Sequence, residues 1–325
     1  MSDPWPSERA LSIVCCPKCD EPLSVTRAGE PAVVQCANRH QFATERGYLD
    51  LSGGQHTDAA TDKTFASFGY EWNAFDDVRE EDARFADVYF RDLELPALKG
   101  SVGLDVGCGK GRYTRFLAPH LDALVALDGS SAVEAAARNL SRFDNVVVVK
   151  SDLRYAPIAP NSVDFLSCLG VLHHLEDPRK GFDRLVELLA PGGRILIYVY
   201  SRPERRGARS LALDASAAMR KVTVGLPHST LKMVTTPIAA ALYAGVVLPG
   251  QLGEKYGVDS LARLPMNSYR GKPFRSLVLD TFDRLSAPVE NRYIWSELEP
   301  WFSENDLTID AHRDETGWFV LAHRS

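Results

Sequence analysis

The sequence lacks several features that would place the protein in a specialised class. It contains no internal repeat and no low-complexity tract, and its first 20 residues do not show the basic-then-apolar pattern of a secretory signal. Only six cysteines occur among 325 residues, which fits a reducing cytoplasm better than a disulfide framework. We therefore expect a cytoplasmic protein.

A long uninterrupted apolar run is also missing. Residues 233–253 carry no charge, but Pro237 and Pro249 bound an apolar segment that covers only residues 238–248. A membrane-spanning helix needs about 20 apolar residues, so the sequence predicts no transmembrane segment. We interpret residues 238–248 as a substrate lid or cap helix, with a membrane-surface helix or a helix that forms a homodimer as the alternatives.

An excess of positive charge is missing too. The 37 Lys and Arg against 43 Asp and Glu give a net charge of −6, which disfavours general nucleic-acid binding because that binding depends on phosphate neutralisation. One local exception is the stretch 201–232, which holds two acidic residues. Its seven basic residues are Arg202, Arg205, Arg206, Arg209, Arg220, Lys221 and Lys232. They could grip a phosphate or carboxylate, or form a solvated helix face.

Apolar runs that alternate with helical patterns fill the centre of the chain. The runs are residues 101–104, 123–127, 146–149, 163–169 and 194–200, and two further short runs follow at 307–312 and 317–323. This alternation predicts an α/β fold, with a Rossmann-like doubly wound sheet of seven strands covered by helices on both faces.

The first run ends in a glycine-rich turn that an acidic residue introduces. Asp105 is followed by Gly107, Gly109 and Gly111, and glycine lets a backbone adopt positive φ and approach a ligand closely. Asp128 ends the second run, 23 residues after Asp105. An acidic residue at this place holds the two ribose hydroxyls in Rossmann-type sites.

Five motifs in this order resemble the class I S-adenosylmethionine-dependent methyltransferases. They are Asp105-x-Gly107-x-Gly109-x-Gly111, Asp128 in Leu-Asp-Gly-Ser, Asp152 in Ser-Asp-Leu, the loop 170–178 (Gly-Val-Leu-His-His-Leu-Glu-Asp-Pro) and Leu189-Ala-Pro-Gly-Gly193. The resemblance implies a methyltransferase that binds S-adenosylmethionine. It places the three glycines along the methionine part of the cofactor and Asp105 at its amino-acid portion. It places Asp128 at the ribose, and Asp152 and Leu153 at the adenine. Leu169 is the last of the predicted cofactor-binding residues.

Aromatic residues are concentrated just before this region, in residues 64–75. They either pack the entry segment onto the sheet, or one of Phe68, Tyr70 and Trp72 closes over the cofactor, where an aromatic face attracts a sulfonium. Related enzymes often carry a tyrosine there, so Tyr70 joins the predicted cofactor-binding residues.

Two adjacent histidines follow the fourth run and are our candidate catalytic residues. His173 or His174 could act as a general base for an oxygen acceptor, since histidine titrates near neutral pH. Alternatively, both cap the loop or pack beneath it. Tyr269 and Asp280 are secondary candidates. The loop with these histidines looks like that of ubiquinone-type and natural-product methyltransferases, so we expect a small-molecule acceptor, with oxygen favoured, in a partly apolar capped pocket.

The amino-terminal segment carries a separate metal-binding pattern. Cys16-x-x-Cys19 and Cys36-x-x-x-His40 offer four ligands, which suit one structural zinc ion with a closed tetrahedral shell. The segment resembles the zinc ribbon of ribosomal-RNA guanine methyltransferases, in which the ribbon helps to engage RNA. An RNA-base methyltransferase that uses this ribbon and the basic stretch is therefore an alternative, as is a non-catalytic methyltransferase-like partner subunit.

These patterns divide the sequence into five parts. They are a zinc ribbon (1–55), an aromatic linker with entry helices (56–99), the cofactor-binding core (100–200), an inserted and mostly helical cap (201–290), and the last helix with the closing strands (291–325).

Overall fold

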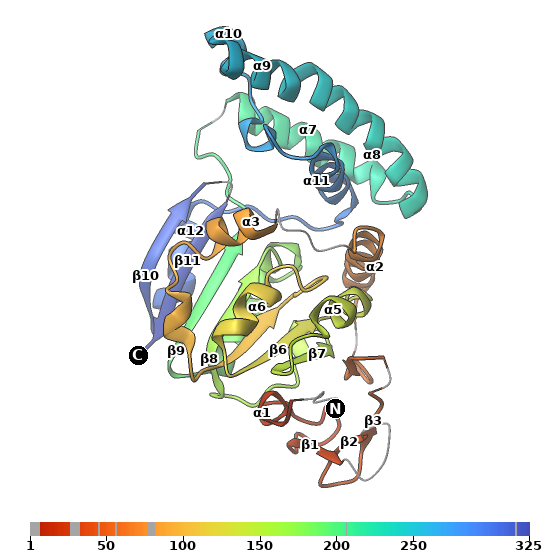
Figure 1. Cartoon of the computed structure of the whole chain (residues 1–325), viewed down its shortest axis with the longest axis vertical. Coiled ribbons are helices and arrows are strands. Elements are labelled where there is room, and N and C mark those ends of the chain that lie inside the picture. Colours follow the sequence, from red (N-terminus) through yellow and green to blue (C-terminus); the bar gives the residue numbers. More distant parts are fainter. Residues whose placement is uncertain are drawn as a thin grey trace. The chain divides into compact units, whose positions relative to one another are not determined.

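The computed structural model (Figure 1) describes residues 7–26, 33–44, 46–55, 57–76, 82–205, 207–315 and 317–325. The chain forms two compact units. The core unit comprises Met1–Glu204 and Val289–Ser325, and the helical unit comprises Arg205–Pro288. The finer five-part division remains an interpretation of the sequence.

A mostly parallel sheet forms the centre of the core unit. Its strand order is β10-β11-β9-β8-β5-β6-β7-β4. The strands are β4 (Leu49–Asp50), β5 (Val102–Val106), β6 (Ala123–Asp128), β7 (Val146–Lys150), β8 (Val163–Leu169), β9 (Leu189–Val199), β10 (Leu307–Asp314) and β11 (Trp318–Arg324). Strands β4 to β9 pair in parallel, whereas β11 is antiparallel to both β9 and β10. The predicted Rossmann-like doubly wound fold is confirmed.

The predicted number of strands was one too low for the described sheet. Strand β4 pairs in parallel with β7, so that Leu49 lies opposite Val149 and Asp50 opposite Lys150. Two residues are too short to show the apolar run by which a buried strand is recognised, so sequence analysis missed this strand.

Helices and two apolar clusters cover both faces of the sheet. The helical elements of the core unit are α1 (Glu8–Leu11), α2 (Ala59–Ala74), α3 (Asp82–Tyr89), η1 (Leu95–Leu98), α4 (Thr114–Leu117), η2 (Ala118–His120), α5 (Val133–Leu140), η3 (Leu153–Tyr155), η4 (Leu172–His174), α6 (Pro178–Leu188) and α12 (Trp295–Ser303). Along β6, Val125 and Leu127 belong to one cluster, and Leu124 and Ala126 to the other. This strand is therefore buried on both sides, as expected when helices cover both faces of a parallel sheet.

The amino-terminal segment forms a small antiparallel sheet of β1 (Leu23–Thr26), β2 (Val33–Cys36) and β3 (Gln41–Phe42). It is attached to the core unit through main-chain hydrogen bonds. The Cys15 N–H donates to the Pro157 carbonyl at 2.8 Å, and the Ala159 N–H donates to the Ile13 carbonyl at 2.8 Å. Val14 is fully buried in the same apolar cluster as β6, so this segment shares the core of the large sheet.

The helical unit is built almost entirely of helices, as predicted for the insertion. They are α7 (Ala208–Thr223), α8 (His228–Leu242), the π-helix η5 (Tyr243–Val247), α9 (Leu248–Tyr256), α10 (Asp259–Ala262), η6 (Asn267–Tyr269) and α11 (Phe274–Ser286). Helix α11 packs against both α7 and α8, and its Leu277, Phe282 and Leu285 are buried in this unit.

The prediction that two prolines confine an apolar segment to residues 238–248 was wrong. The chain is helical without interruption from His228 to Tyr256. Pro237 lies inside α8, and Pro249 lies in the first turn of α9, directly after the π-helix. By length and composition this helix could cross a membrane, although 22% of its apolar stretch is buried. The two prolines therefore do not exclude a membrane segment.

Candidate functional site

A pocket opens in the core unit at the carboxyl ends of β5, β6 and β8. Its lining residues are Thr64, Phe65, Phe68, Trp72, Gly107, Leu127, Asp128, Gly129, Ser130, Asp152, Leu153, Leu169, Gly170, Val171, His174 and Leu175. The empty space amounts to about 710 Å³, including the open mouth, which is large enough for a small-molecule ligand. Open α/β sheets bind their ligands at this end of the strands.

The glycine-rich turn brings the main chain of β5 close against β6. The N–H groups of Gly107 and Cys108 both donate to the Leu127 carbonyl, at 2.7 and 3.1 Å. Gly107 has a φ of 71°, and a Cβ atom there would lie 2.2 Å from Cγ2 of Val171. Only glycine fits this position without displacing Val171, and the pocket thereby gains a wall of bare main chain.

Asp128 is fixed at the end of β6 by three hydrogen bonds. Its carboxylate accepts from the Gly109 N–H at 2.9 Å, from the Ser130 N–H at 2.8 Å and from the Ser130 hydroxyl at 2.6 Å. Burial raises the pKa of Asp128 above its usual range, while these bonds lower it. A carboxylate has about four acceptor positions, so Asp128 is oriented and still able to accept a hydroxyl of a ligand.

Asp105 lies beneath the turn and does not line the pocket. Its buried carboxylate accepts from the hydroxyls of Thr114 and Ser167, both at 2.6 Å. Burial raises the pKa of Asp105, and the two hydroxyl bonds lower it. The side chain thereby ties the start of α4 to the middle of β8. Gly109 and Gly111 also belong to the turn without lining the pocket.

The carboxylate of Asp152 is held by a neighbouring arginine. Nη2 of Arg154 donates to it at 2.6 Å, and the same guanidinium donates to Asp58 at 3.1 Å and to the Thr61 hydroxyl at 3.1 Å. The bond to Asp152, followed by that to Asp58, raises the pKa of Arg154. A bond from the Thr61 N–H lowers the pKa of Asp58 below its usual range. Arg154 therefore fastens the first turn of α2 beside the pocket.

Sequence analysis did not identify Arg154 or its partner Asp58. A signal for Asp58 was available, because an aspartate that directly precedes a helix is a common N-cap. Gln55 was missed as well, although its side chain accepts from the Asp152 N–H at 3.0 Å. No sequence pattern marked that contact.

Three aromatic residues of α2 form one wall of the pocket. Phe65, Phe68 and Trp72 are spaced by three and four residues and therefore share a helix face. They line the pocket, as the second interpretation of the aromatic segment proposed for Phe68 and Trp72. Tyr70 is not brought into the lining, because it lies about 200° around the helix from Phe68. The wall sits tightly, since a Cβ at Gly129 would lie 2.3 Å from the Phe65 ring.

The structure separates the two candidate histidines. His174 lines the pocket, with its ring 4.9 Å from that of Phe68. Its Nδ1 lies 2.8 Å from the Val289 carbonyl. Because a carbonyl only accepts, the network assigns the proton of the neutral ring to Nδ1 and leaves Nε2 as an acceptor. His173 is fully buried outside the lining, and its ring stacks on Tyr200 at 3.9 Å.

The secondary candidates and several cations have partners within their own unit. The Tyr269 hydroxyl donates to Asp280 at 2.6 Å in the helical unit, and burial raises the pKa of Tyr269. Arg202 forms an ion pair with Glu297. Arg220 is buried and donates to the Arg284 carbonyl at 2.9 Å. Arg206 of the basic stretch lies outside the described residues.

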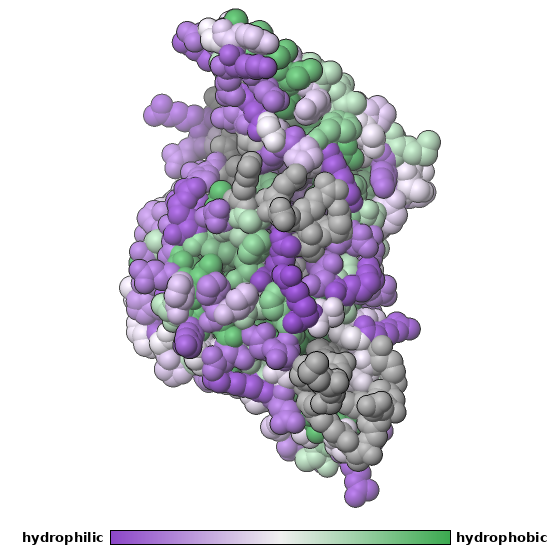
Figure 2. All heavy atoms as spheres, viewed as in Figure 1, coloured by the Kyte–Doolittle hydropathy of each residue, from purple (hydrophilic) through white to green (hydrophobic). Residues whose placement is uncertain are grey.

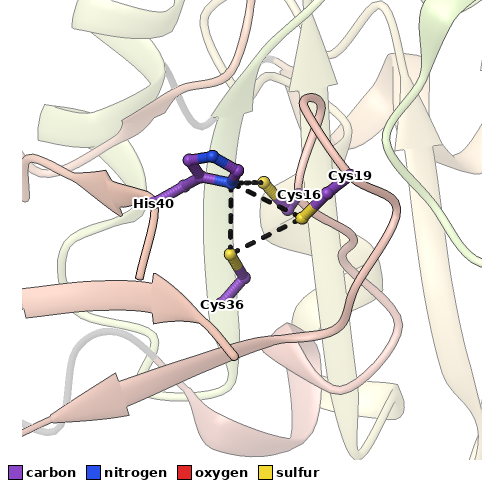
Figure 3. Close-up of side chains that lie close together, drawn as sticks. All are labelled: Cys16, Cys19, Cys36 and His40. Carbon is purple, nitrogen blue, oxygen red and sulfur yellow. Dashed lines mark hydrogen bonds between the residues drawn. The ribbon is translucent and has the colours of Figure 1, made fainter. Parts of the chain in front are cut away.

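The four predicted metal ligands converge in the amino-terminal segment (Figure 3). Their ligand atoms all lie within 4.8 Å of one another. His40 Nδ1 is 3.4, 3.5 and 3.4 Å from the sulfurs of Cys16, Cys19 and Cys36, and the Cys19 and Cys36 sulfurs are 3.7 Å apart. Bonds of about 2.3 Å to sulfur and about 2.0 Å to nitrogen require tetrahedron edges of roughly 3.5 to 3.8 Å. The donor set therefore fits one tetrahedral zinc ion.

Comparison with known proteins relates the region around the pocket to methyltransferases. Residues 104–197 match the family model of a methyltransferase domain. A tRNA (carboxymethyluridine(34)-5-O)-methyltransferase of Schizosaccharomyces pombe is 27% identical over 143 residues, which cover 43% of this chain and 58% of that protein. A demethylmenaquinone methyltransferase of Clavibacter sepedonicus is 36% identical over 101 residues, which cover 31% and 41%. Methyltransferase cfoB of Aspergillus candidus is 31% identical over 168 residues, which cover 49% and 52%.

The similarity to these relatives is partial. The matched regions span 41% to 58% of the relatives' own length, and the family model covers the part of the chain that holds β5, β6, β8 and the pocket loops. The family match therefore includes the glycine-rich turn, Asp128 and the loop with His174.

The contact between Gly107 and Val171 can be tested by a double-mutant cycle. We expect Gly107→Ala to reduce the free energy of unfolding by about 2 kcal/mol more than Gly192→Ala, because only the first substitution adds a clash to the strain of a positive φ. Urea unfolding measures both values. In a Val171→Ala background most of the difference should disappear, because only the Cβ of residue 171, at 3.2 Å, remains close to the added methyl group. A difference that persists in full would contradict the assigned contact.

Proposed function

We propose that this chain, in which residues 104–197 form a class I S-adenosylmethionine-dependent methyltransferase domain, transfers a methyl group from S-adenosylmethionine to an oxygen atom of a small molecule. One arrangement carries this proposal. The glycine turn, the fixed carboxylate of Asp128, the aromatic wall of α2 and the imidazole of His174 all face one pocket.

The residues around the pocket fit S-adenosylmethionine. Asp128 has acceptor capacity for the ribose hydroxyls, and the bare main chain at Gly107 leaves room for the methionine part. Leu153 and Asp152 would contact the adenine, although the Asp152 carboxylate also holds Arg154. Phe68 and Trp72 offer ring faces to a positively charged sulfonium. When bound, the cofactor supplies an electrophilic methyl group.

The chain's own contribution to the reaction is to align the acceptor and to remove its proton. In our proposal Nε2 of His174 accepts the proton of the acceptor hydroxyl, and the Val289 carbonyl holds the ring in the tautomer that makes this possible. Phe65, Phe68 and Trp72 exclude water from that side. We assign His173 a structural role, because it packs against Tyr200 away from the pocket.

An RNA acceptor is the second candidate, and the tRNA-methyltransferase relative favours it. The charge distribution counts against it. Outside residues 205–288 the sequence has 25 basic and 38 acidic residues, a formal charge of −13, which would repel phosphates from the unit that holds the pocket.

We also propose that Cys16, Cys19, Cys36 and His40 hold one zinc ion. The support is the match of donor types and distances to a tetrahedral shell. Four protein ligands leave no position for water or substrate, so the ion would stabilise the segment and take no part in catalysis.

The ribose assignment predicts a loss of cofactor affinity. Asp128→Ala should weaken S-adenosylmethionine binding at least about tenfold, since it removes a charged acceptor of the ribose hydroxyls. Isothermal titration calorimetry measures this, with Asp144→Ala, a change of an exposed aspartate, as the control. Equal affinities of the two variants would contradict the assignment.

The base assignment predicts a loss of rate without a loss of cofactor affinity. His174→Ala should slow methyl transfer about a hundredfold, because the acceptor keeps its proton, and His120→Ala should leave the rate unchanged. Transfer of labelled methyl groups to the small-molecule fraction of a cell extract measures the rate. Label that enters only RNA would favour the second candidate instead.

The metal assignment predicts one zinc ion per chain by elemental analysis. Cys36→Ser should lose the ion and lower the melting temperature, because zinc binding contributes directly to the folding of such small segments. Cys15→Ser is the matched control, since Cys15 is next to the cluster but outside it. Full zinc content in the Cys36→Ser protein would overturn the proposal.

A further inference from the structure

Exposed apolar side chains are concentrated in the helical unit. Among the described residues, twelve large apolar side chains are exposed, and eleven of them lie between Arg205 and Pro288. The exception is Tyr155 in the core unit. Monomeric proteins rarely leave contiguous apolar surface open unless it contacts a partner or a membrane.

Part of this exposed apolar surface lies along one face of a single helix. Seven apolar residues on the helix from His228 to Tyr256, spaced by three or four, are all exposed and form what we call the apolar stripe. They are Met233, Pro237, Ala241, Ala244, Leu248, Leu252 and Tyr256. This spacing places them on one face, over a length of about 35 Å. Figure 2 shows hydrophobic residues along α8 and α9.

The opposite face of the same helix also carries mainly apolar residues, and this face is buried inside the helical unit. Leu231, Thr235 and Ala239 of α8 are buried, and Val247 and Gly250 continue this face. Helix α8 packs against α11. A helix with apolar residues on two opposite faces is expected where both faces are covered, yet here only one face has a cover within the described residues.

The helical unit is positively charged, so a partner that covers the stripe should carry negative charge. Residues 205–288 contain twelve basic and five acidic residues, a formal charge of +7, in a chain whose net charge is −6. Lys221, Lys255 and Arg263 are exposed. Lys255 lies between the last two stripe residues in sequence, with its Nζ 5.5 Å from the Tyr256 ring.

We propose that the helical unit docks on the surface of an anionic lipid bilayer, with the apolar stripe in the interfacial region. An exposed apolar face with flanking lysines and arginines is the pattern of helices that lie in a membrane interface, and each cation near an anionic surface adds attraction. This inference goes beyond the proposed methyl transfer and does not depend on it.

Two other occupants of the stripe fit the structure less well. A spanning helix would carry α11 into the hydrocarbon, because α8 packs on α11, and α11 contains Arg275, Asp280, Asp283 and Arg284. Such charges are costly at the bilayer centre. A second copy of the chain would bring two units of charge +7 together, which like-charge repulsion opposes.

The test is co-sedimentation of the full-length protein with vesicles of phosphatidylcholine containing about one-third phosphatidylglycerol. We expect binding that weakens at least about tenfold on pure phosphatidylcholine vesicles or in high salt. Leu252→Glu and Met233→Glu should each weaken it about tenfold or more, since each places a charge in the interface. Both side chains are exposed, so the fold should persist.

Ser260→Glu is the matched control, because it adds the same charge to an exposed position of the same unit outside the stripe. It should bind nearly as well as the unchanged protein. The proposal is overturned if the protein does not sediment with anionic vesicles, or if both stripe variants bind like the control. It is also overturned if bound protein resists alkaline carbonate, as a spanning helix would, or if Leu252→Glu only converts a dimer to monomers.

Discussion

The close approach of the turn after β5 to the end of β6 is the constraint on which the pocket depends. Two N–H groups, of Gly107 and Cys108, share the Leu127 carbonyl, and one residue later the Gly109 N–H donates to Asp128. The same turn leaves space at Gly107 that Val171 of the next loop fills. A side chain at Gly107 would therefore displace the loop that also carries His174. The glycine thus fixes the distance between the turn after β5 and the pocket wall that carries His174.

The second constraint is electrostatic and concerns the aromatic wall. Helix α2 lies between the short edge strand β4 and the rest of the sheet in sequence, and it has no strand pairing to hold it. Arg154 supplies the link, because its guanidinium bonds to Asp152 at the end of β7 and to Asp58 at the N-cap of α2. With 28% of its side chain exposed, Arg154 remains partly solvated. Solvent screening therefore reduces what its ion pairs contribute to the stability of the fold. The close packing of Phe65 on Gly129 and the hydrogen bond from Asn73 to the Ser131 carbonyl at 3.0 Å hold the same helix.

Most of the fold and part of the site could be predicted from the sequence, because both depend on local patterns. Apolar runs gave seven strands of the sheet, and the order of the glycines and aspartates gave the place of the pocket. Strand β4 was missed because two residues show no pattern. The two histidines could not be told apart, since their difference comes from contacts with Val289 and Tyr200, which are distant in sequence. The prolines misled because the helix continues through both of them, with Pro237 inside α8 and Pro249 directly after the π-helix.

The division of charge between the two units indicates two separate tasks. The pocket of the core unit contains Asp128 and Asp152 and lies in a part of the chain with a formal charge of −13. This suits a cofactor whose reactive group is a cation, and it opposes the approach of polyanions. The helical unit has the opposite charge and an open apolar face. A bilayer surface matches both properties at once, because it presents negative headgroups above an apolar interior.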